Sequence, residues 1–141
     1  MIDRKFVETK LAYVRAYCQE LEAVLDFLDQ EIKGDILRLR ALERIIQLIV
    51  DEIIDINNHI IRYAQLRVPE DFQSAFLILA ENKILPERFA RKIAPVVGLR
   101  NRLVHRYEKV DVGILLDTIR KSKGDFKNYV KHILKYLSHS T

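Results

Sequence analysis

The sequence predicts an all-α protein, an up-and-down bundle of about five helices in one domain spanning residues 1–141. Apolar residues recur three and four positions apart through most of the chain, which is the spacing of one face of an α-helix. Only four glycines and three prolines occur in 141 residues, too few turn residues for a β-sandwich. This length suits a single domain with one core.

The first long helix is expected from Val7 to about Ile32, because its apolar residues alternate four and three positions apart. This stripe comprises Val7, Leu11, Val14, Cys18, Leu21, Leu25, Leu28 and Ile32. The residues Lys33-Gly34-Asp35 interrupt the pattern. Gly34 suits the left-handed position after a helix, and Asp35 can cap the helix that follows.

A second long helix is expected from Leu39 to Tyr63, with apolar residues again three and four apart. Further apolar residues widen this stripe to a second face: Ile45, Val50, Ile54 and Ile61. A helix that is apolar on two faces is buried twice, inside its own bundle and against another surface. We therefore expect a homodimer in which this second face meets a second subunit.

Prolines separate the remaining helices. Residues 69–85 fit a short helix and a turn, and Pro86 suits the first turn of the next helix. Pro95 and Gly98 fall inside that helix, which should kink or split there. Asp111 can cap a last helix running to about Leu137. Its inward residues are predicted to be Ile119, Phe126, Val130, Ile133 and Leu137.

Several classes of protein are disfavoured by the composition. The single cysteine, Cys18, cannot form an intrachain disulfide, and no group of residues has metal-ligand spacing. The N-terminal residues MIDRKFVETK are unlike a signal peptide, and apolar runs such as IIQLIVDEIIDI contain carboxylates. We expect a cytoplasmic protein that needs no metal or cofactor and has no membrane contact.

Charge is distributed unevenly along the chain. Residues 1–80 contain 10 Lys and Arg against 14 Asp and Glu, a net charge of −4, whereas residues 81–141 contain 14 against 6, a net charge of +8. A basic half is typical of proteins that meet a polyanion or an acidic partner. The alternative is an ordinary solvated surface of lysines on the last helix.

The most informative stretch is GLRNRLVHRYEKVD at residues 98–111. Arg100 continues the inward stripe of the fourth helix, where an arginine needs a partner. One interpretation is a structural ion pair with Asp55 or Glu52 on the second long helix. The other is a guanidinium held ready for a phosphate, which its planar fork matches.

His105 adds acid–base capacity to this helix, because histidine titrates near neutral pH. Asn101 lies four residues before it and can orient the ring. Arg100 and His105 are about 140° apart around an ideal helix. To act together, Arg100 must reach round the helix, the helix must distort near its end, or a second copy of the chain must complete the site. Two histidines and two arginines in one dimer cleft can transfer a phosphodiester without metal.

The run Arg100-Asn101-Arg102-Leu103-Val104-His105-Arg106-Tyr107 resembles the Arg-x-x-x-x-His-x-Tyr motif of the HepT toxins, which belong to the HEPN superfamily. The resemblance continues through IIDINNHII at 53–61, RVPEDFQSAFLILAENKILPE at 67–87 and the last helix. It covers nearly the whole chain in the same order.

The resemblance implies a dimeric, metal-independent ribonuclease toxin of a type VII toxin–antitoxin system, with a HEPN-like fold. Arg100 and His105 would be catalytic, and Asn101 would support them. Asp55 matches a polar position of the family's second helix, and we expect it to pair with Arg100. Arg102 and Arg106 are expected to bind RNA phosphates.

The family's partner is a small nucleotidyltransferase antitoxin that transfers AMP to the motif tyrosine, here Tyr107. AMP at this position would place a phosphate and a base beside Arg100 and His105 and so block RNA. The plain alternative for Tyr107 is a packing tyrosine with a solvated hydroxyl. The alternative for the whole chain is a non-catalytic helical adaptor that binds a nucleotide or the nucleotidyltransferase.

Overall fold

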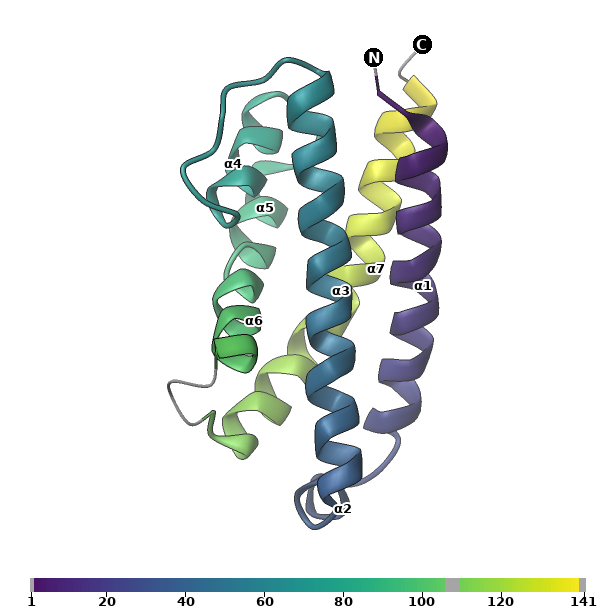
Figure 1. Ribbon diagram of the computed structural model, residues 1–141, viewed down its shortest axis with the longest axis vertical. Coiled ribbons are helices and arrows are strands. Elements are labelled where there is room, and N and C mark those ends of the chain that lie inside the picture. The colour runs from purple at the N-terminus through teal and green to yellow at the C-terminus, as the bar shows by residue number, and fades with distance from the viewer. Residues whose placement is uncertain (1, 106–109, 140–141) are drawn as a thin grey trace.

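The structure, a computed structural model, describes residues 2–105 and 110–139 (Figure 1). Seven helices and no strand occur in these two ranges, which confirms the all-α class. The helices are α1 (Arg4–Leu25), α2 (Asp29–Lys33), α3 (Ile36–Tyr63), α4 (Ser74–Glu81), α5 (Glu87–Ile93), α6 (Val96–His105) and α7 (Val112–His139).

Three long helices form the body of the bundle. α1 and α3 run antiparallel and are joined at one end by the short α2, while α7 crosses behind α3 and meets α1 along its second half (Figure 1). The short helices α4, α5 and α6 follow one another along the other side of α3. This arrangement sets the basic motif helix α6 directly against α3.

The expected first helix is wrong in its extent, because it breaks into α1 and α2. Leu28 is extended, with φ −68° and ψ 154°, and is 69% exposed, so it leaves the apolar stripe. Arg120 from α7 stabilises the non-helical segment between α1 and α2. Its guanidinium donates to the carbonyls of Leu25 and Phe27, each at 2.9 Å, and to Asp29 Oδ1 at 2.8 Å. A distant arginine thus ends a helix that local periodicity would have continued.

The two N-caps predicted from the sequence are present, whereas the conformation predicted for Gly34 is not. Asp35 Oδ1 accepts from the Leu37 N–H at 2.9 Å, and Asp111 Oδ1 accepts from the Ile114 N–H at 3.0 Å. Both predicted N-caps are therefore confirmed. The left-handed conformation expected of Gly34 is wrong, since its φ is −84°.

The expected interruption at Pro95 is confirmed, because α5 ends at Ile93 and α6 begins at Val96. Proline has no N–H to continue the ladder of an incoming helix. The Pro95 carbonyl instead accepts from the Gly98 N–H at 3.1 Å and starts the new helix. The breaks before α2 and before α6 together turn the five expected helices into seven.

The second apolar face of α3 is covered within the chain itself. Ile45, Val50, Ile54 and Ile61 are between 0% and 8% exposed. The helices packed on α3 besides α1 are chiefly α2, α4 and α6. The expectation that this face meets a second subunit is therefore wrong, because these residues are already buried within one chain.

One polar pair lies inside the core. The Tyr129 hydroxyl on α7 donates to Asn57 Oδ1 on α3 at 2.5 Å, and both side chains are fully buried. Burial raises the pKa of Tyr129 well above its usual value, so its hydroxyl keeps the proton that it donates. This bond fixes the register of α7 against α3 at a depth that water does not reach.

None of the helices in the described parts of the chain is both long and apolar enough to cross a lipid bilayer.

Candidate functional site

The motif helix α6 directs Arg100 toward the middle of α3. Arg100 Nε donates to Asp51 Oδ1 at 2.7 Å, and the two side chains are 21% and 34% exposed. This is a part-buried, charge-assisted hydrogen bond, which is stronger than a neutral one. The inward direction predicted for Arg100 is confirmed, and its partner is a carboxylate.

The prediction that Arg100 pairs with Asp55 or Glu52 is wrong. Both carboxylates turn toward α1, where Lys10 Nζ lies 2.9 Å from Asp55 Oδ2 and 3.1 Å from Glu52 Oε2. Asp55 stands one helical turn beyond Asp51, about 6 Å further along the α3 axis. That displacement puts Asp51 at the level of Arg100 and Asp55 at the level of Lys10.

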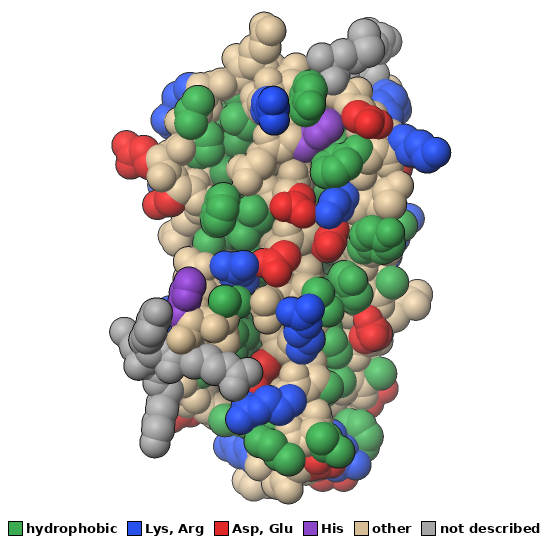
Figure 2. Space-filling view, viewed as in Figure 1, with side chains coloured by type: hydrophobic (Ala, Val, Ile, Leu, Met, Phe, Trp, Pro, Cys, Tyr) green, Lys and Arg blue, Asp and Glu red, His purple; other side chains and the backbone are tan. Residues whose placement is uncertain are grey.

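Acidic side chains gather along the middle of the face over α3, with basic side chains beside them (Figure 2). Asp51, Glu52 and Asp55 supply three carboxylates within five residues of this helix. The pairing of each one depends on which neighbouring helix faces it. Asp51 is the site residue that sequence reasoning missed, although its presence in this acidic run was the available signal.

Asn101 supports Arg100 in the structure. Its Oδ1 accepts a hydrogen bond from Arg100 Nη1 at 3.1 Å. This contact agrees with the expectation that Asn101 supports Arg100. The expectation that Asn101 orients the His105 ring stays a prediction. Asp51 and Asn101 together hold the guanidinium from two directions.

The remaining hydrogen-bond donors of Arg100 are suited to an anion. A guanidinium carries five N–H donors in a flat fork, and the contacts to Asp51 and Asn101 engage Nε and Nη1. The side chain is 21% exposed, so part of it reaches solvent. A phosphate approaching from that side would meet a cation whose orientation is already set.

His105 is the last residue of α6 and is exposed. It stands five residues after Arg100, which turns it about 140° around the helix. Helix geometry therefore gives the two side chains different directions within one chain. Arg106 and Tyr107, which follow directly, lie outside the described residues.

Arg102 faces away from Arg100, toward α7. It lines a small hollow of about 140 Å³ between α5, α6 and α7, together with Lys92 and Asp125. Lys92 Nζ lies 3.2 Å from the buried Asp125 carboxylate. Arg102 is exposed at the edge of this hollow. Among the described residues no group of three potential metal ligands comes together.

Comparison with known proteins relates the chain to a family of nucleases. Residues 14–133 match the family model described as "Ribonuclease HepT-like". The "tRNA nuclease HepT" of Aphanizomenon flos-aquae is 31% identical over 138 residues, which is 96% of this chain and 92% of the relative. The "mRNA nuclease HepT" of Shewanella oneidensis is 32% identical over 77 residues, 55% of this chain and 58% of the relative.

Solved structures share the fold over nearly the whole chain. The tri-AMPylated HEPN toxin of Shewanella oneidensis, solved in complex with the MNT antitoxin, gives a TM-score of 0.87 at 24% identity. The alignment covers 94% of this chain and 99% of that one. YutE of Bacillus subtilis, described as a cytosolic protein of unknown function, gives a TM-score of 0.82 at 25% identity, covering 96% and 91%.

Proposed function

Because this chain belongs to the HepT-like ribonuclease family, we propose that it is an RNA endonuclease and the toxin of a type VII toxin–antitoxin system. The observation that carries the proposal is the Arg100 guanidinium, held by Asp51 and Asn101 on the motif helix with donors left for a phosphate. Relatives named as tRNA and mRNA nucleases support RNA as the substrate. We place the activity in the cytoplasm.

The proposed active form is a homodimer with the two α6 helices at a shared cleft. One chain contributes a single motif histidine, whereas the reaction needs a base and an acid at the same time. A two-fold arrangement supplies two copies each of Arg100 and His105. It also overcomes the difference in direction between these side chains on one helix.

In the proposed reaction, one His105 takes the proton of the ribose 2′-OH, and the 2′-oxygen attacks the adjacent phosphorus. The bond from phosphorus to the 5′-oxygen breaks, and the partner's His105 gives that leaving oxygen a proton. Arg100 stabilises the negative charge that grows on the phosphoryl oxygens. The products are a 2′,3′-cyclic phosphate and a 5′-hydroxyl, and both proton transfers are made by imidazoles.

The other residues have positioning or binding roles. Asp51 and Asn101 hold the Arg100 fork, so that its free donors keep one direction as RNA binds. Arg102 and Arg106 are proposed to bind neighbouring phosphates of the RNA strand. Asp55, whose carboxylate faces Lys10, has no proposed contact with the reacting groups.

We further propose that a cognate nucleotidyltransferase antitoxin silences the enzyme by transferring AMP from ATP to Tyr107. Support comes from the likeness to a toxin that was solved in an AMPylated state with its antitoxin. The modification would add a phosphate and a planar base to the motif segment. Arg100 or Arg102 can hold that phosphate through charge-assisted hydrogen bonds, in competition with RNA.

RNA cleavage by wild-type protein, Arg100→Ala and His105→Ala tests the proposal. Each variant should lose cleavage of total tRNA and of a transcribed mRNA while its circular-dichroism spectrum and melting temperature stay close to those of wild type. The alternative function is a helical adaptor that only binds a nucleotide or the nucleotidyltransferase. Indistinguishable RNA degradation by wild type and His105→Ala would favour this adaptor and reject the nuclease.

A further inference from the structure

Large apolar side chains are exposed at the end of the bundle where the chain passes from α1 through α2 into α3. Phe27 and Leu28 follow α1, and Ile36 and Leu37 begin α3. Their exposed fractions are 36%, 69%, 57% and 76%. Figure 2 shows hydrophobic side chains at this lower end of the molecule, with charged ones beside them. We call these four residues the α2-end patch.

The patch is one surface with a fixed shape. The Arg38 guanidinium carbon lies 3.8 Å from the centroid of the Phe27 ring, which brings the segment after α1 against the first turn of α3. Arg120 holds the same segment through the Phe27 carbonyl at 2.9 Å. An exposed apolar patch of more than about a few hundred Å² marks an interaction surface on a soluble protein. Four large apolar side chains that are more than a third exposed provide such an area.

The charges around the patch have both signs. Asp26 and Glu31 are exposed acids, Lys33 is an exposed base, and Arg38 is a half-buried base. In a two-fold contact, each patch meets the same patch of the other copy, so a mixed set of charges can place acids against bases. A patch of one sign would instead repel its copy. The mixture therefore favours a second copy of this chain over a strongly acidic or basic partner.

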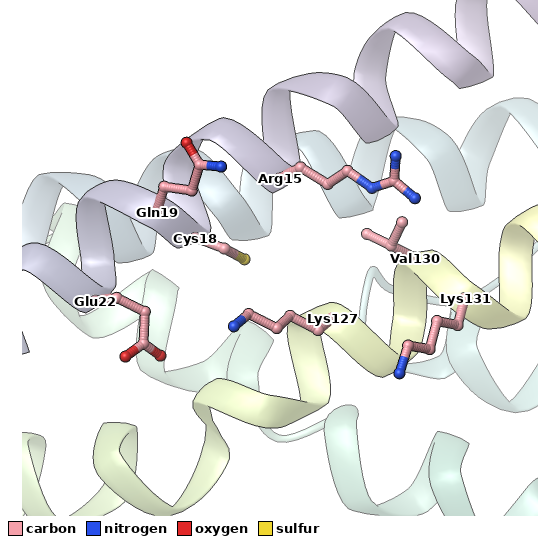
Figure 3. Close-up of a pocket in the computed structure, with 7 residues that line it drawn as sticks. All are labelled: Arg15, Cys18, Gln19, Glu22, Lys127, Val130 and Lys131. Carbon is pink, nitrogen blue, oxygen red and sulfur yellow. The ribbon is translucent and has the colours of Figure 1, made fainter.

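The flank between α1 and α7 has a different character. Arg15, Lys127 and Lys131 line a hollow there together with one carboxylate, that of Glu22 (Figure 3). This carboxylate already lies 3.2 Å from Lys123 Nζ. A two-fold contact through the flank would bring the cations of each copy toward those of the other, which is unfavourable. Self-association is therefore disfavoured on this flank and favoured at the α2-end patch.

The patch is also separate from the proposed nuclease centre. Leu37 lies on the first turn of α3, whereas Asp51, the carboxylate that holds Arg100, lies near the middle of the same helix. The rise of an α-helix puts about 20 Å between these two positions along the α3 axis. A contact at the patch therefore leaves the side of Arg100 open. The patch and a cleft between α6 helices can be occupied at the same time.

We propose that the α2-end patch is a second self-association surface, through which two copies of this chain meet end to end about a two-fold axis. Leu28, Ile36 and Leu37 pack against the same patch of the other copy, and the surrounding acids and bases meet in opposite pairs. Joined to the proposed α6 dimer, this contact links two dimers. The patch is smaller than the roughly 800 Å² per partner of a standard interface, so the dissociation constant should be on the order of 100 µM.

Sedimentation measured from about 5 µM to about 500 µM, on both sides of that constant, tests the proposal. The wild-type mass should double across the range, whether the smaller form is a monomer or a dimer. Failure of the nuclease proposal or of the α6 dimer therefore leaves this test intact. Leu28→Asp and Leu37→Asp should each keep the smaller mass throughout. Leu28 is the N-cap of α2 and Leu37 is in the first turn of α3, where aspartate is favourable, so both variants should fold.

Val68→Asp is the matched control. Val68 is 86% exposed and lies in the segment that follows the other end of α3, so this variant should double in mass as wild type does. Equal losses in Val68→Asp and Leu37→Asp would overturn the proposal, because they would show general adhesion between apolar side chains. A wild-type mass that stays constant across the concentration range would also overturn it.

RNA cleavage separates the patch from the proposed nuclease interface. Leu37→Asp should cleave RNA within about twofold of wild type, because the substitution lies about 20 Å from Asp51 along α3. A monomeric mass and lost cleavage in Leu37→Asp would contradict a second surface, since the patch would then be the nuclease interface itself. The doubling should also persist in about 0.5 M NaCl, because salt screens charges and leaves an apolar contact in place. Loss of the doubling in this salt would reject the apolar patch as its cause.

Discussion

Arg100 Nε on α6 donates to Asp51 Oδ1 on α3 at 2.7 Å, and this bond joins the motif helix to the centre of the bundle. Asn101 adds a second contact to the same guanidinium at 3.1 Å. The orientation of the proposed phosphate-binding group therefore depends on a residue 49 positions away in sequence. Substituting that residue tests the arrangement directly.

We predict that Asp51→Ala lowers RNA cleavage about tenfold or more, because Arg100 loses the acceptor that fixes its orientation. Asp51→Asn keeps an oxygen acceptor without the charge and should fall between Asp51→Ala and wild type. Single-turnover cleavage assays measure the effect. Asp55→Ala is the control, since Asp55 pairs with Lys10, and it should retain activity within about twofold. Similar losses in Asp51→Ala and Asp55→Ala would contradict a specific role of Asp51.

Cleavage should continue unchanged in excess EDTA, because the proposed acid and base are both imidazoles. The upstream fragment of each cut should carry a 2′,3′-cyclic phosphate at its 3′ end, which attack by the ribose 2′-OH requires, and the downstream fragment should begin with a 5′-hydroxyl. End-group analysis by mass spectrometry distinguishes this product from a 3′-hydroxyl. Loss of activity on chelation, with recovery on adding Mg²⁺, would show that the proposed mechanism is wrong.

The protein should be a dimer in solution at micromolar concentration, because one chain supplies only one His105 to a reaction that needs two. Light scattering coupled to size-exclusion chromatography gives the mass. A disulfide between copies of His105→Cys under mild oxidation would further place the two motif helices at one cleft. A monomeric mass in the active preparation would rule out the shared cleft.

Tyr107→Phe should resist silencing by the nucleotidyltransferase partner, because the hydroxyl that accepts AMP is absent. The ring is retained, so the melting temperature should change little. After incubation with partner and ATP, intact-mass spectrometry should show AMP adducts on wild type and none on the variant. Adducts that persist on Tyr107→Phe, or silencing that proceeds without ATP, would refute the switch.

The stability of the fold should fall in mild acid, in part because of His59. Its Nε2 accepts from the Asp3 N–H at 3.0 Å, and its ring stacks on Phe6 with centroids 4.6 Å apart. Burial lowers the pKa of His59, and the nearby Asp3 carboxylate opposes this only in part. The stability contributed by neutral His59 is thus present above the unfolded pKa of about 6.5 and is lost as pH falls below it.

Melting temperatures measured from about pH 7.5 to about pH 5 check this expectation. Wild type should lose stability across the range, and His59→Asn should lose less of it. Burial also lowers the pKa of His132, so some acid sensitivity should remain in the variant. Identical pH profiles for wild type and His59→Asn would exclude the proposed contribution.

The sequence by itself was enough for the fold class, the main helices and the family. Apolar periodicity in α3 and α7 is long and regular, so each buried stripe could be predicted. The inward residues Phe126, Val130 and Ile133 are all buried. Capping residues act on their own helix, which explains why Asp35 and Asp111 were predicted correctly. The motif around Arg100 and His105 is contiguous and needed no structure to be recognised.

Tertiary contacts decided the remaining features, because they depend on the distance between helices. Local periodicity cannot show that Arg120 reaches across from α7 to end α1 at Leu25. Nor can it show that the second apolar face of α3 is buried within a single chain and is not left for a second subunit. The choice of Asp51 over Asp55 as the partner of Arg100 depends on one helical turn of axial offset between α6 and α3. Only the packing of the two helices sets that offset.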